Sequence, residues 1–458
     1  MPTINDTLKI LAETGVEIAG DLVDAPIAGY IGDTLISLLW PDSSTDVWEQ
    51  VQNDVATLLN ETIDQTIYTQ LSLKLSGLLG VYANYINSLK SGDLGTIKDN
   101  WTAAHDQFTA DSKGFQQPGP FVPLFVQVVN LQLALLKDGV ENGLNWNWQP
   151  VYVDQIHQEL KEAIYDSTHW VESAYSTGLL PLSTPPPGIG GSSTAAAVWQ
   201  QQNVYVRAMV LTVWDFVFLW PYFDPDSHAP SPLPANTREI YSDLIGGFTN
   251  NPIGQAIDSG TAPALPTLPA PVVTDIYNPY LSPQSPNYSS SAPVSIQWNQ
   301  SPKPAVSSIT TWVQYTPNNA GSPWVYTLFS AQVSRAGAPN PDPMTGAQPA
   351  LGTPSSWSTM PVTSARGGFG GGNWPYINWI QLVSNDDLTN VSPVIGNLYG
   401  SNYNETWAGP QPFVFTYPLN QLSNLLFTQV AEPDPPHNIP PMPVAVIFGF
   451  RLSNSYLC

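Results

Sequence analysis

Polar side chains recur on one face of an otherwise apolar run, which covers residues 121–138 and has the sequence FVPLFVQVVNLQLALLKD. Gln127, Asn130, Ala134 and Asp138 are separated by steps of three, four and four, so they fall on one side of a helix. Such a face can meet water while the apolar face meets hydrocarbon. The pattern has two interpretations: a helix buried at the centre of a bundle, or a helix that is buried at first and enters a membrane later.

The residues around this run predict the helix that must position the polar face. Pro123 falls in the first turn, where its missing N–H costs nothing, and Gly139 follows as the expected C-cap. At ~1.5 Å per residue the run spans roughly 27 Å, close to the ~30 Å hydrocarbon core of a bilayer. Gln127, Asn130 and Gln132 would lie near the bilayer centre, which disfavours a permanent membrane span.

The segment resembles the central-helix motif of the three-domain insecticidal crystal (Cry) delta-endotoxins. The matching positions are Pro123, Gln127, Asn130, Leu131, Leu133, Leu136 and Asp138. Gln132 departs from the usual His of that motif, and Lys137 departs from its usual Arg. In that family a buried helix of this kind is wrapped by amphipathic helices and is thought to enter the target membrane with its neighbour. The resemblance implies the same for a hairpin of residues 96–113 with 121–138.

The resemblance extends, in order and in spacing, over residues 1–245. Residues 175–179 are similar to the end of the family's penultimate helix, and residues 207–224 resemble its last helix. Residues 237–243 resemble the short strand that leaves the toxin domain. The implied fold is a bundle of seven helices, six of them around the central one.

Arg207, Asp215 and Arg238 are charges within or shortly after an apolar helix that we expect over residues 195–220. A charge in such a helix must be paired, because an unpaired buried charge is costly. We expect these three residues to form structural pairs that lock helices together and dock the next domain.

The chain of 458 residues is long enough for two or three domains, and it is acidic, with 13 Lys and Arg against 36 Asp and Glu. This balance argues against a nucleic-acid partner. The single cysteine, Cys458, is the last residue, so we expect no internal disulfide. The N-terminus lacks the basic start and apolar core of a signal peptide. We therefore expect a protein that is stored in the producer cell or as a crystal inclusion, and then released to act at a host membrane.

Beyond a Pro-, Ala- and Gly-rich segment at 250–271 the hydrophobic period changes to two, which is typical of strands. The alternating runs form three sets: 308–315 with 324–330, 376–383 with 394–399, and 413–417 with 425–430 and 444–452. Three sets favour a pseudo-threefold β-prism, as in jacalin-like lectins and similar in pattern to the second domain of the Cry toxins. A jelly-roll sandwich, like the third domain of those toxins, is the alternative.

The sequence gives little support for an enzymatic function. The five histidines are scattered without metal-ligand spacing, and neither a phosphate loop nor a nucleophile elbow occurs. The glycine-rich stretch 367–373 precedes a predicted strand, so it offers a phosphate no helix N-terminus. We expect no catalytic residue, metal or cofactor. Trp357, Trp374 and Trp407 lie near Gly- or Ser-rich loops and are candidates for a receptor or sugar loop, with core packing or loop anchoring as the alternative.

These observations predict a multidomain α + β protein, with a helical membrane-insertion domain at 1–248 and a β-rich receptor- or carbohydrate-binding domain at 249–458. The resemblance implies an insecticidal-type pore-forming toxin that binds a host surface receptor, such as a glycan. Its further partner is either a small toxin protein or other copies of the chain, in a homo-oligomeric pore. The family's third domain is not expected here, which makes the layout similar to PirB-like toxin subunits. The alternatives are the large subunit of a two-component toxin with a small partner protein, and a non-lytic lectin or adhesin.

Overall fold

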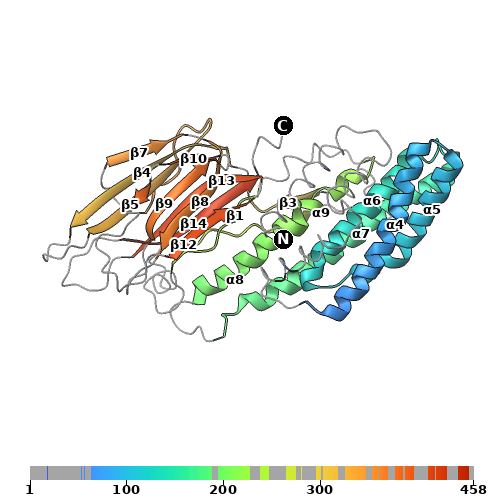
Figure 1. Cartoon of the computed structure of the whole chain (residues 1–458), viewed down its shortest axis with the longest axis horizontal. Helices are drawn as coiled ribbons and strands as arrows, with labels where there is room; N and C mark the ends of the chain where they lie inside the picture. Colours follow the sequence, from blue (N-terminus) through green and yellow to red (C-terminus); the bar gives the residue numbers. More distant parts are fainter. Residues whose placement is uncertain are drawn as a thin grey trace.

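The structure is a computed structural model of the chain, with helices gathered toward one end and β-sheets toward the other (Figure 1). It describes residues 18, 53, 56, 63–187, 194–226, 238–246, 265–274, 280, 295–300, 303–317, 325–346, 353–358, 360–369, 377–384, 387–392, 394–396, 411–417, 419–430 and 442–452. The helices predicted before residue 65 lie almost entirely outside these ranges, although Ile18, Asn53 and Ala56 are helical.

The described α-helices are α4 (Gln65–Ser91), α5 (Leu94–Asp111), α6 (Val122–Asn142), α7 (Pro150–Leu179), α8 (Thr194–Met209) and α9 (Asp215–Val217). Short 3-10 turns join them: η1 (Ser112–Phe115), η2 (Gly119–Phe121), η3 (Leu180–Ser183) and η5 (Trp220–Phe223). The π-helical turn η4 (Val210–Trp214) continues α8 into α9, and η5 follows. We call this continuous stretch, Thr194–Phe223, the α8 rod.

Local chemistry explains the hairpin of α4 and α5. The Asp64 carboxylate caps α4 by accepting hydrogen bonds from the backbone N–H groups of Thr66 and Ile67. At the other end Gly92 takes the left-handed conformation, with φ 68°, and Asp93 at once caps α5. This tight connection forces the two helices to run antiparallel.

α6 is the central helix and is buried along almost its whole length. α5, α7 and η5 pack around it, and α4 reaches it through Tyr85. The helix continues past Gly139 to Asn142, so the predicted C-cap at Gly139 was wrong. Gly139 serves close packing instead, because a Cβ atom there would lie 2.7 Å from Cζ2 of Trp101.

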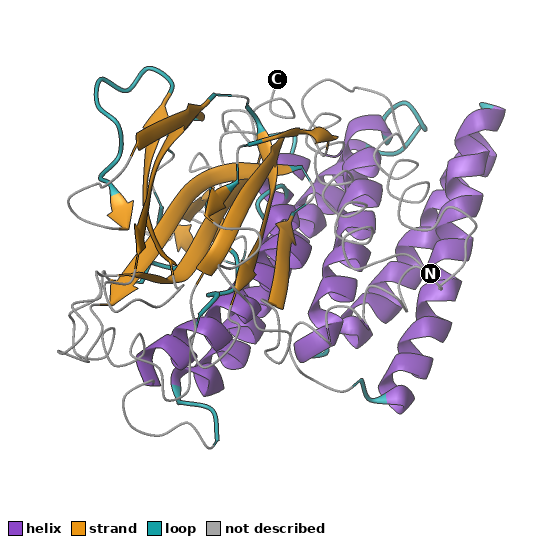
Figure 2. Ribbon diagram, turned by 60° about the vertical axis from the view of Figure 1, so that its left-hand side comes forward, coloured by secondary structure: helices purple, strands orange, loops and turns teal. Residues whose placement is uncertain are grey.

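The strands are β1 (Ile240–Tyr241), β2 (Pro271–Thr274), β3 (Ser295–Trp298), β4 (Val306–Pro317), β5 (Val325–Arg335), β6 (Thr345–Gly346), β7 (Thr353–Trp357), β8 (Val362–Phe369), β9 (Ile377–Ser384), β10 (Asp387–Val391), β11 (Ile395–Gly396), β12 (Gln411–Thr416), β13 (Asn420–Val430) and β14 (Met442–Leu452). They form sheets in the orders β6-β5-β4-β7, β10-β9-β8-β12 with β11 on β9, β1-β14-β13, and the pair β2-β3. Each described pairing is antiparallel, and Figure 2 shows these sheets beside the helices.

The helical N-terminal region and the antiparallel C-terminal sheets confirm the predicted multidomain α + β class. The preference for a β-prism over a jelly-roll sandwich stays a prediction. Two regions distant in sequence are joined by β1, where Ile240 pairs with Phe450 and Tyr241 pairs with Gly449 of the final strand. The domain boundary proposed after residue 248 therefore follows a strand that is hydrogen-bonded into the C-terminal sheet.

Candidate membrane-insertion site

The four residues predicted to share a face of α6 are all buried: Gln127, Asn130, Ala134 and Asp138 are between 0% and 7% exposed. Three of them are polar, and a buried polar group costs free energy unless it is hydrogen-bonded. Their hydrogen-bond partners therefore decide how firmly α6 is held in the soluble protein.

In the first half of α6, the hydrogen-bond partner of the polar face is a tryptophan from the end of the α8 rod. Trp220 in η5 donates its indole N–H to Oδ1 of Asn130 across 2.7 Å. Asn130 in turn donates through Nδ2 to Oε1 of Gln127, at 2.9 Å, one turn earlier. These bonds form a buried chain of three side chains that fixes α6 against η5.

Toward the end of α6 the partners come from α4 and α5. Tyr85 donates its hydroxyl to Oδ2 of Asp138 at 3.0 Å, and Trp101 donates its indole N–H to the Leu135 carbonyl at 2.8 Å. Burial raises the pKa of Tyr85 well above its usual range, and the charge of Asp138 raises it further. Tyr85 therefore remains a protonated donor at physiological pH.

We call Tyr85, Trp101 and Trp220 the aromatic donors, because each gives one hydrogen bond to α6 from a different element. They are not among the site residues predicted from the sequence. They lie 53, 34 and 90 residues from their acceptors, and buried aromatic residues at helical spacing give the same pattern whether or not they donate.

The predicted hairpin partner α5 is also joined to α7. His105 lies with Nε2 2.9 Å from Oε2 of Glu159 and stacks on Trp101, with ring centroids 4.8 Å apart. His105 lies one turn after Trp101, so this contact to α7 lies beside the contact that Trp101 makes with α6. Any movement of α5 with α6 away from α7 must break the contact between His105 and Glu159.

Two stretches of the described chain are long and apolar enough to cross a membrane: Gly119–Asn142, which contains α6, and Thr194–Phe223, the α8 rod. In each, 89% of the most apolar window is buried inside the protein. The core helix of a soluble protein has the same properties, so the apolar character alone does not decide between the two interpretations of α6.

The charges predicted to lock the helices meet at the junction between the helical and β regions. Arg238 is fully buried and donates through Nη2 to Oδ2 of Asp215 at 2.5 Å and through Nη1 to Asn420 of β13 at 3.0 Å. Arg207 of α8 donates to the Tyr241 carbonyl of β1 and to Asp243, both at 2.7 Å. Each arginine therefore contacts both regions, and a docking role for them remains our proposal.

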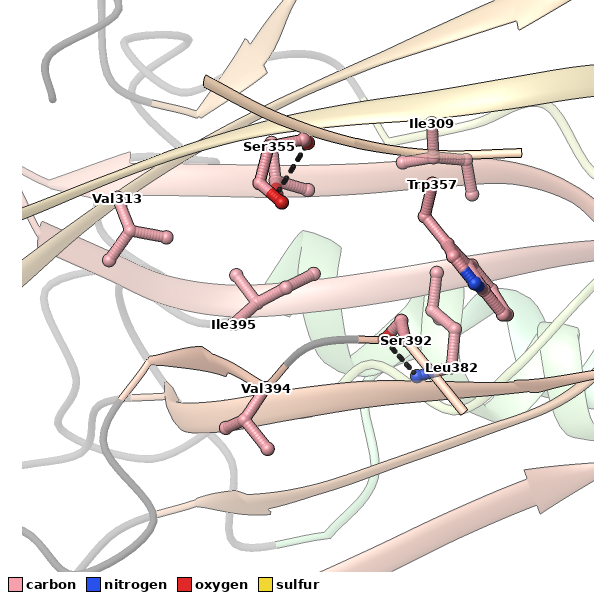
Figure 3. A pocket seen from close by; sticks show the side chains of 9 residues that line it. Ile309, Val313, Ser355, Trp357, Leu382, Ser392, Val394 and Ile395 are labelled. Carbon is pink, nitrogen blue, oxygen red and sulfur yellow. Dashed lines mark hydrogen bonds between the residues drawn. The ribbon is translucent and has the colours of Figure 1, made fainter. Parts of the chain in front are cut away.

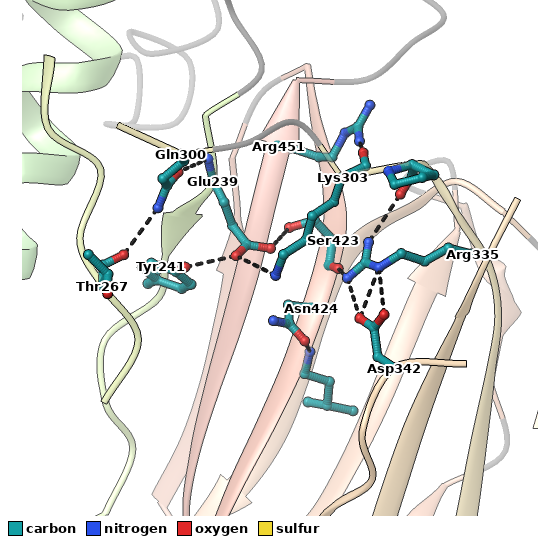
Figure 4. Close-up of polar contacts among 12 residues, drawn as sticks. Glu239, Tyr241, Thr267, Gln300, Lys303, Arg335, Asp342, Ser423, Asn424 and Arg451 are labelled. Atoms are coloured by element: carbon teal, nitrogen blue, oxygen red, sulfur yellow. Dashed lines mark hydrogen bonds and ion pairs between the residues drawn. The ribbon is translucent and has the colours of Figure 1, made fainter. Parts of the chain in front are cut away.

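Glu239 is not among the residues predicted from the sequence, yet its carboxylate accepts hydrogen bonds from two side chains at this junction (Figure 4). Its carboxylate accepts from the Ser423 hydroxyl at 2.5 Å and the Tyr241 hydroxyl at 2.8 Å, and Lys303 lies 3.5 Å away. Its backbone N–H donates to Gln300 at 2.7 Å. One buried carboxylate thus joins β1, β13 and the segment after β3.

Trp357 is the member of the candidate sugar-binding residues that the structure describes. Trp374 and Trp407 lie outside the described residues. Trp357 ends β7 and lines a crevice of about 50 Å³ between two sheets, shown in Figure 3. The other lining residues are Ile309, Thr311, Val313, Ser355, Leu382, Ser392, Val394 and Ile395. This mostly apolar setting suits core packing, and a sugar-binding role for Trp357 stays a prediction.

The glycine-rich stretch predicted as a loop begins inside a strand. Gly367, Gly368 and Phe369 belong to β8 and pair with β12, while residues 370–373 lie outside the described chain. A Cβ atom on Gly367 would lie 2.2 Å from the Phe413 ring, so this glycine admits an aromatic ring across the sheet.

Comparison with known proteins supports a family for the helical region. Residues 12–224 match the family described as delta endotoxin, N-terminal domain. Pesticidal crystal protein Cry9Ca of Bacillus thuringiensis subsp. tolworthi is 29% identical over 261 residues, which cover 53% of this chain and 22% of that protein. Cry26Aa of subsp. finitimus is 28% identical over 262 residues, covering 54% and 21%. The chain thus spans about a fifth of the length of these relatives.

Solved structures show a similar fold over nearly the whole chain. The insecticidal delta-endotoxin Cry8Ea1 from Bacillus thuringiensis has a TM-score of 0.67 and 17% identity, covering 98% of this chain and 74% of that structure. PirB has a TM-score of 0.64 and 11% identity, covering 96% and 94%. The PirB match accounts for almost all of both chains.

Proposed function

We propose that this chain, whose residues 12–224 match the delta-endotoxin N-terminal domain family, is an insecticidal-type pore-forming toxin. The observation that carries the proposal is the polar face of α6, which is buried and accepts hydrogen bonds from Tyr85 and Trp220. A helix that served only as a core would need no such face, because apolar residues would bury at lower cost.

The proposed mechanism begins with the β-rich region binding a host surface receptor, such as a glycan. The helical region then opens, and the hairpin of α5 and α6 enters the bilayer. Inside the membrane the Gln127, Asn130, Ala134 and Asp138 face meets water and the opposite face meets lipid. Helices keep all their backbone hydrogen bonds, so the inserted hairpin leaves no backbone group unsatisfied.

The energetic barrier to opening is the helical core itself. To release the hairpin of α5 and α6 from the bundle, the hydrogen bonds from Tyr85 and Trp220 must break, and α5 must leave Glu159. Water replaces these bonds only after the polar face is exposed. The bond from Trp101 joins α5 to α6 and can persist within the hairpin. We infer that receptor binding or another trigger must first loosen this core, and that the protein acts by insertion rather than by catalysis.

A second candidate follows from the match to PirB, which covers both chains almost completely. In this case the chain would be the large subunit of a two-component toxin and would permeabilise membranes only with a small partner protein. Affinity capture from the native producer would return a stoichiometric small protein if this candidate is correct.

Dye release from liposomes tests the first proposal. We expect release when host gut membrane extract is present in the vesicles, and little release without it. Glycan binding with no release under any condition would favour a lectin or adhesin. Release that appears only with a co-purified small protein would favour the two-component toxin.

A further inference from the structure

His157, Asp224 and Asp226 come together where α7 meets the residues that follow η5. We propose that these three side chains bind a divalent transition-metal ion such as Zn²⁺. One ligand atom from each residue lies within 4.8 Å of the other two. His157 and Asp224 are 67 residues apart in the chain, which is why short-range ligand spacing in the sequence did not reveal the cluster.

The distances suit three ligands around one ion. Nε2 of His157 lies 2.7 Å from Oδ1 of Asp224 and 3.8 Å from Oδ2 of Asp226. Around a tetrahedral Zn²⁺ with bonds of about 2.1 Å, neighbouring ligand atoms are roughly 3.4 Å apart. Small side-chain rotations would therefore seat the ion, with a water molecule completing the fourth position.

The donor set and its burial also suit such an ion. One imidazole and two carboxylates are ligands that Zn²⁺ accepts readily, and imidazole discriminates against Mg²⁺ and Ca²⁺. The Asp224 side chain is 6% exposed and that of His157 19%, whereas the Asp226 side chain is 68% exposed. The cluster thus has two largely buried ligands and one ligand that faces solvent. An ion can reach the site from the solvent-exposed side.

Lys161 shows that the cluster attracts positive charge. It lies one turn after His157 on α7, with Nζ 3.4 Å from Oδ2 of Asp226. A divalent ion would displace this ammonium, whose long flexible side chain can turn toward solvent. Lys161 is therefore a competitor for the site, and removing its charge should tighten metal binding.

The proposed ion would join α7 to the end of the α8 rod. His157 belongs to α7, and both aspartates follow η5, whose Trp220 holds α6 through Asn130. A ligand that binds only the folded protein raises its stability by mass action. Zinc should therefore raise the melting temperature of the helical region.

Titration calorimetry with Zn²⁺ tests the proposal on the full chain. The background carries Cys458→Ser, because a free thiol also binds zinc. We expect one equivalent bound, with affinity reduced about tenfold or more in His157→Gln and Asp226→Asn. Lys161→Met should bind several-fold more tightly. His169→Gln is the matched control, because His169 is an exposed histidine of the same helix, and it should bind as the parent does.

A second measurement separates metal binding from misfolding. The melting temperature of each variant is recorded without metal and again with Zn²⁺. We expect zinc to raise it in the parent and in His169→Gln, but not in His157→Gln. The proposal is overturned if neither the parent nor Lys161→Met binds zinc, or if His169→Gln loses binding as fully as His157→Gln does.

Discussion

Trp220 donates its indole N–H to Oδ1 of Asn130 across 2.7 Å and 90 residues of sequence. This bond ties the end of the α8 rod to the polar face of the central helix. Through Arg207 and Asp215 the same rod is tied to the β region. The α8 rod therefore contacts both α6 and the β region, which the proposed mechanism must separate from each other.

Removing the donor of this bond should loosen α6. We expect Trp220→Phe to lower the free energy of unfolding by about 1–3 kcal/mol more than a matched ring change, because buried Asn130 loses a partner. Trp214→Phe is that match: Trp214 is equally buried, and its Nε1 has no hydrogen-bond partner among the described residues. Denaturant unfolding measures both variants, and equal losses in the two would show that the hydrogen bond contributes nothing.

The bond between Tyr85 and Asp138 predicts a pH dependence at high pH. Burial and the Asp138 charge raise the pKa of Tyr85 in the folded protein above its ordinary value of 10.0. This contribution to stability is complete below about pH 10, and it is lost as the pH rises toward the folded pKa. We expect Tyr85→Phe to flatten the alkaline loss of stability.

The same variant should be less stable than the parent near neutral pH, because Asp138 loses a donor. Tyr165→Phe removes a hydroxyl from α7 instead and leaves the contact between Tyr85 and Asp138 in place. Unfolding titrations at pH 8 and pH 11 compare the three proteins. An alkaline slope that Tyr165→Phe flattens as much as Tyr85→Phe does would contradict the assignment.

Gly139→Ala tests the close packing of α5 on α6. The new Cβ atom would lie 2.7 Å from Trp101, whose ring also donates to α6, so we expect a loss of about 1–3 kcal/mol. Gly80→Ala in α4 is the control, because a Cβ atom there meets nothing within 4 Å. In a helix interior this change should stabilise by about 0.5–1 kcal/mol. Thermal unfolding that shifts both variants in the same direction would refute the packing argument.

The buried pair Arg238 and Asp215 should respond differently to single and double changes. Arg238→Met leaves Asp215 without its cation, and we expect a loss of about 3–5 kcal/mol. The double variant Arg238→Met with Asp215→Leu should recover most of it, because neither charge is left unpaired. Chemical denaturation provides the comparison. Losses that simply add would mean that the two side chains do not act as a pair.

The position and the polar face of the central helix could be predicted from the sequence, but the residues that contact it could not. Gln127, Asn130 and Asp138 interrupt an apolar run at helical spacing, and this local pattern predicts a buried helix with one polar face. The identity of their partners depends on tertiary packing, which no short-range pattern contains. Gly139 shows the same limit, because a glycine near a helix end predicts a cap when no neighbouring helix is known.

In the β region the hydrophobic period predicted where strands occur, but not which strands pair. Alternation predicts strands around Ile309 and Phe448, yet pairing between β1 and β14 joins residues about two hundred positions apart. Glu239 was overlooked for the same reason, since its partners Ser423 and Lys303 come from distant segments. A single acidic residue in a sequence with 36 carries no signal of its own.

In the proposed mechanism α5 and α6 leave the bundle to form the pore, and a reversible crosslink between α5 and α7 would block this step. His105 and Glu159 meet through long side chains, at 2.9 Å between Nε2 and Oε2, whereas a disulfide needs Cβ atoms about 4 Å apart. Cysteines at these two positions, in a Cys458→Ser background, are therefore joined by a short thiol crosslinker that reductant cleaves. Cysteines in place of Gln158 and Glu162, neighbours on α7 alone, give a control crosslink within one helix.

Dye release from receptor-containing liposomes is then measured before and after reduction. If α5 and α6 insert together, the crosslink between α5 and α7 abolishes release, reductant restores it, and the control crosslink has no effect. Full release from the crosslinked protein would contradict insertion of this hairpin.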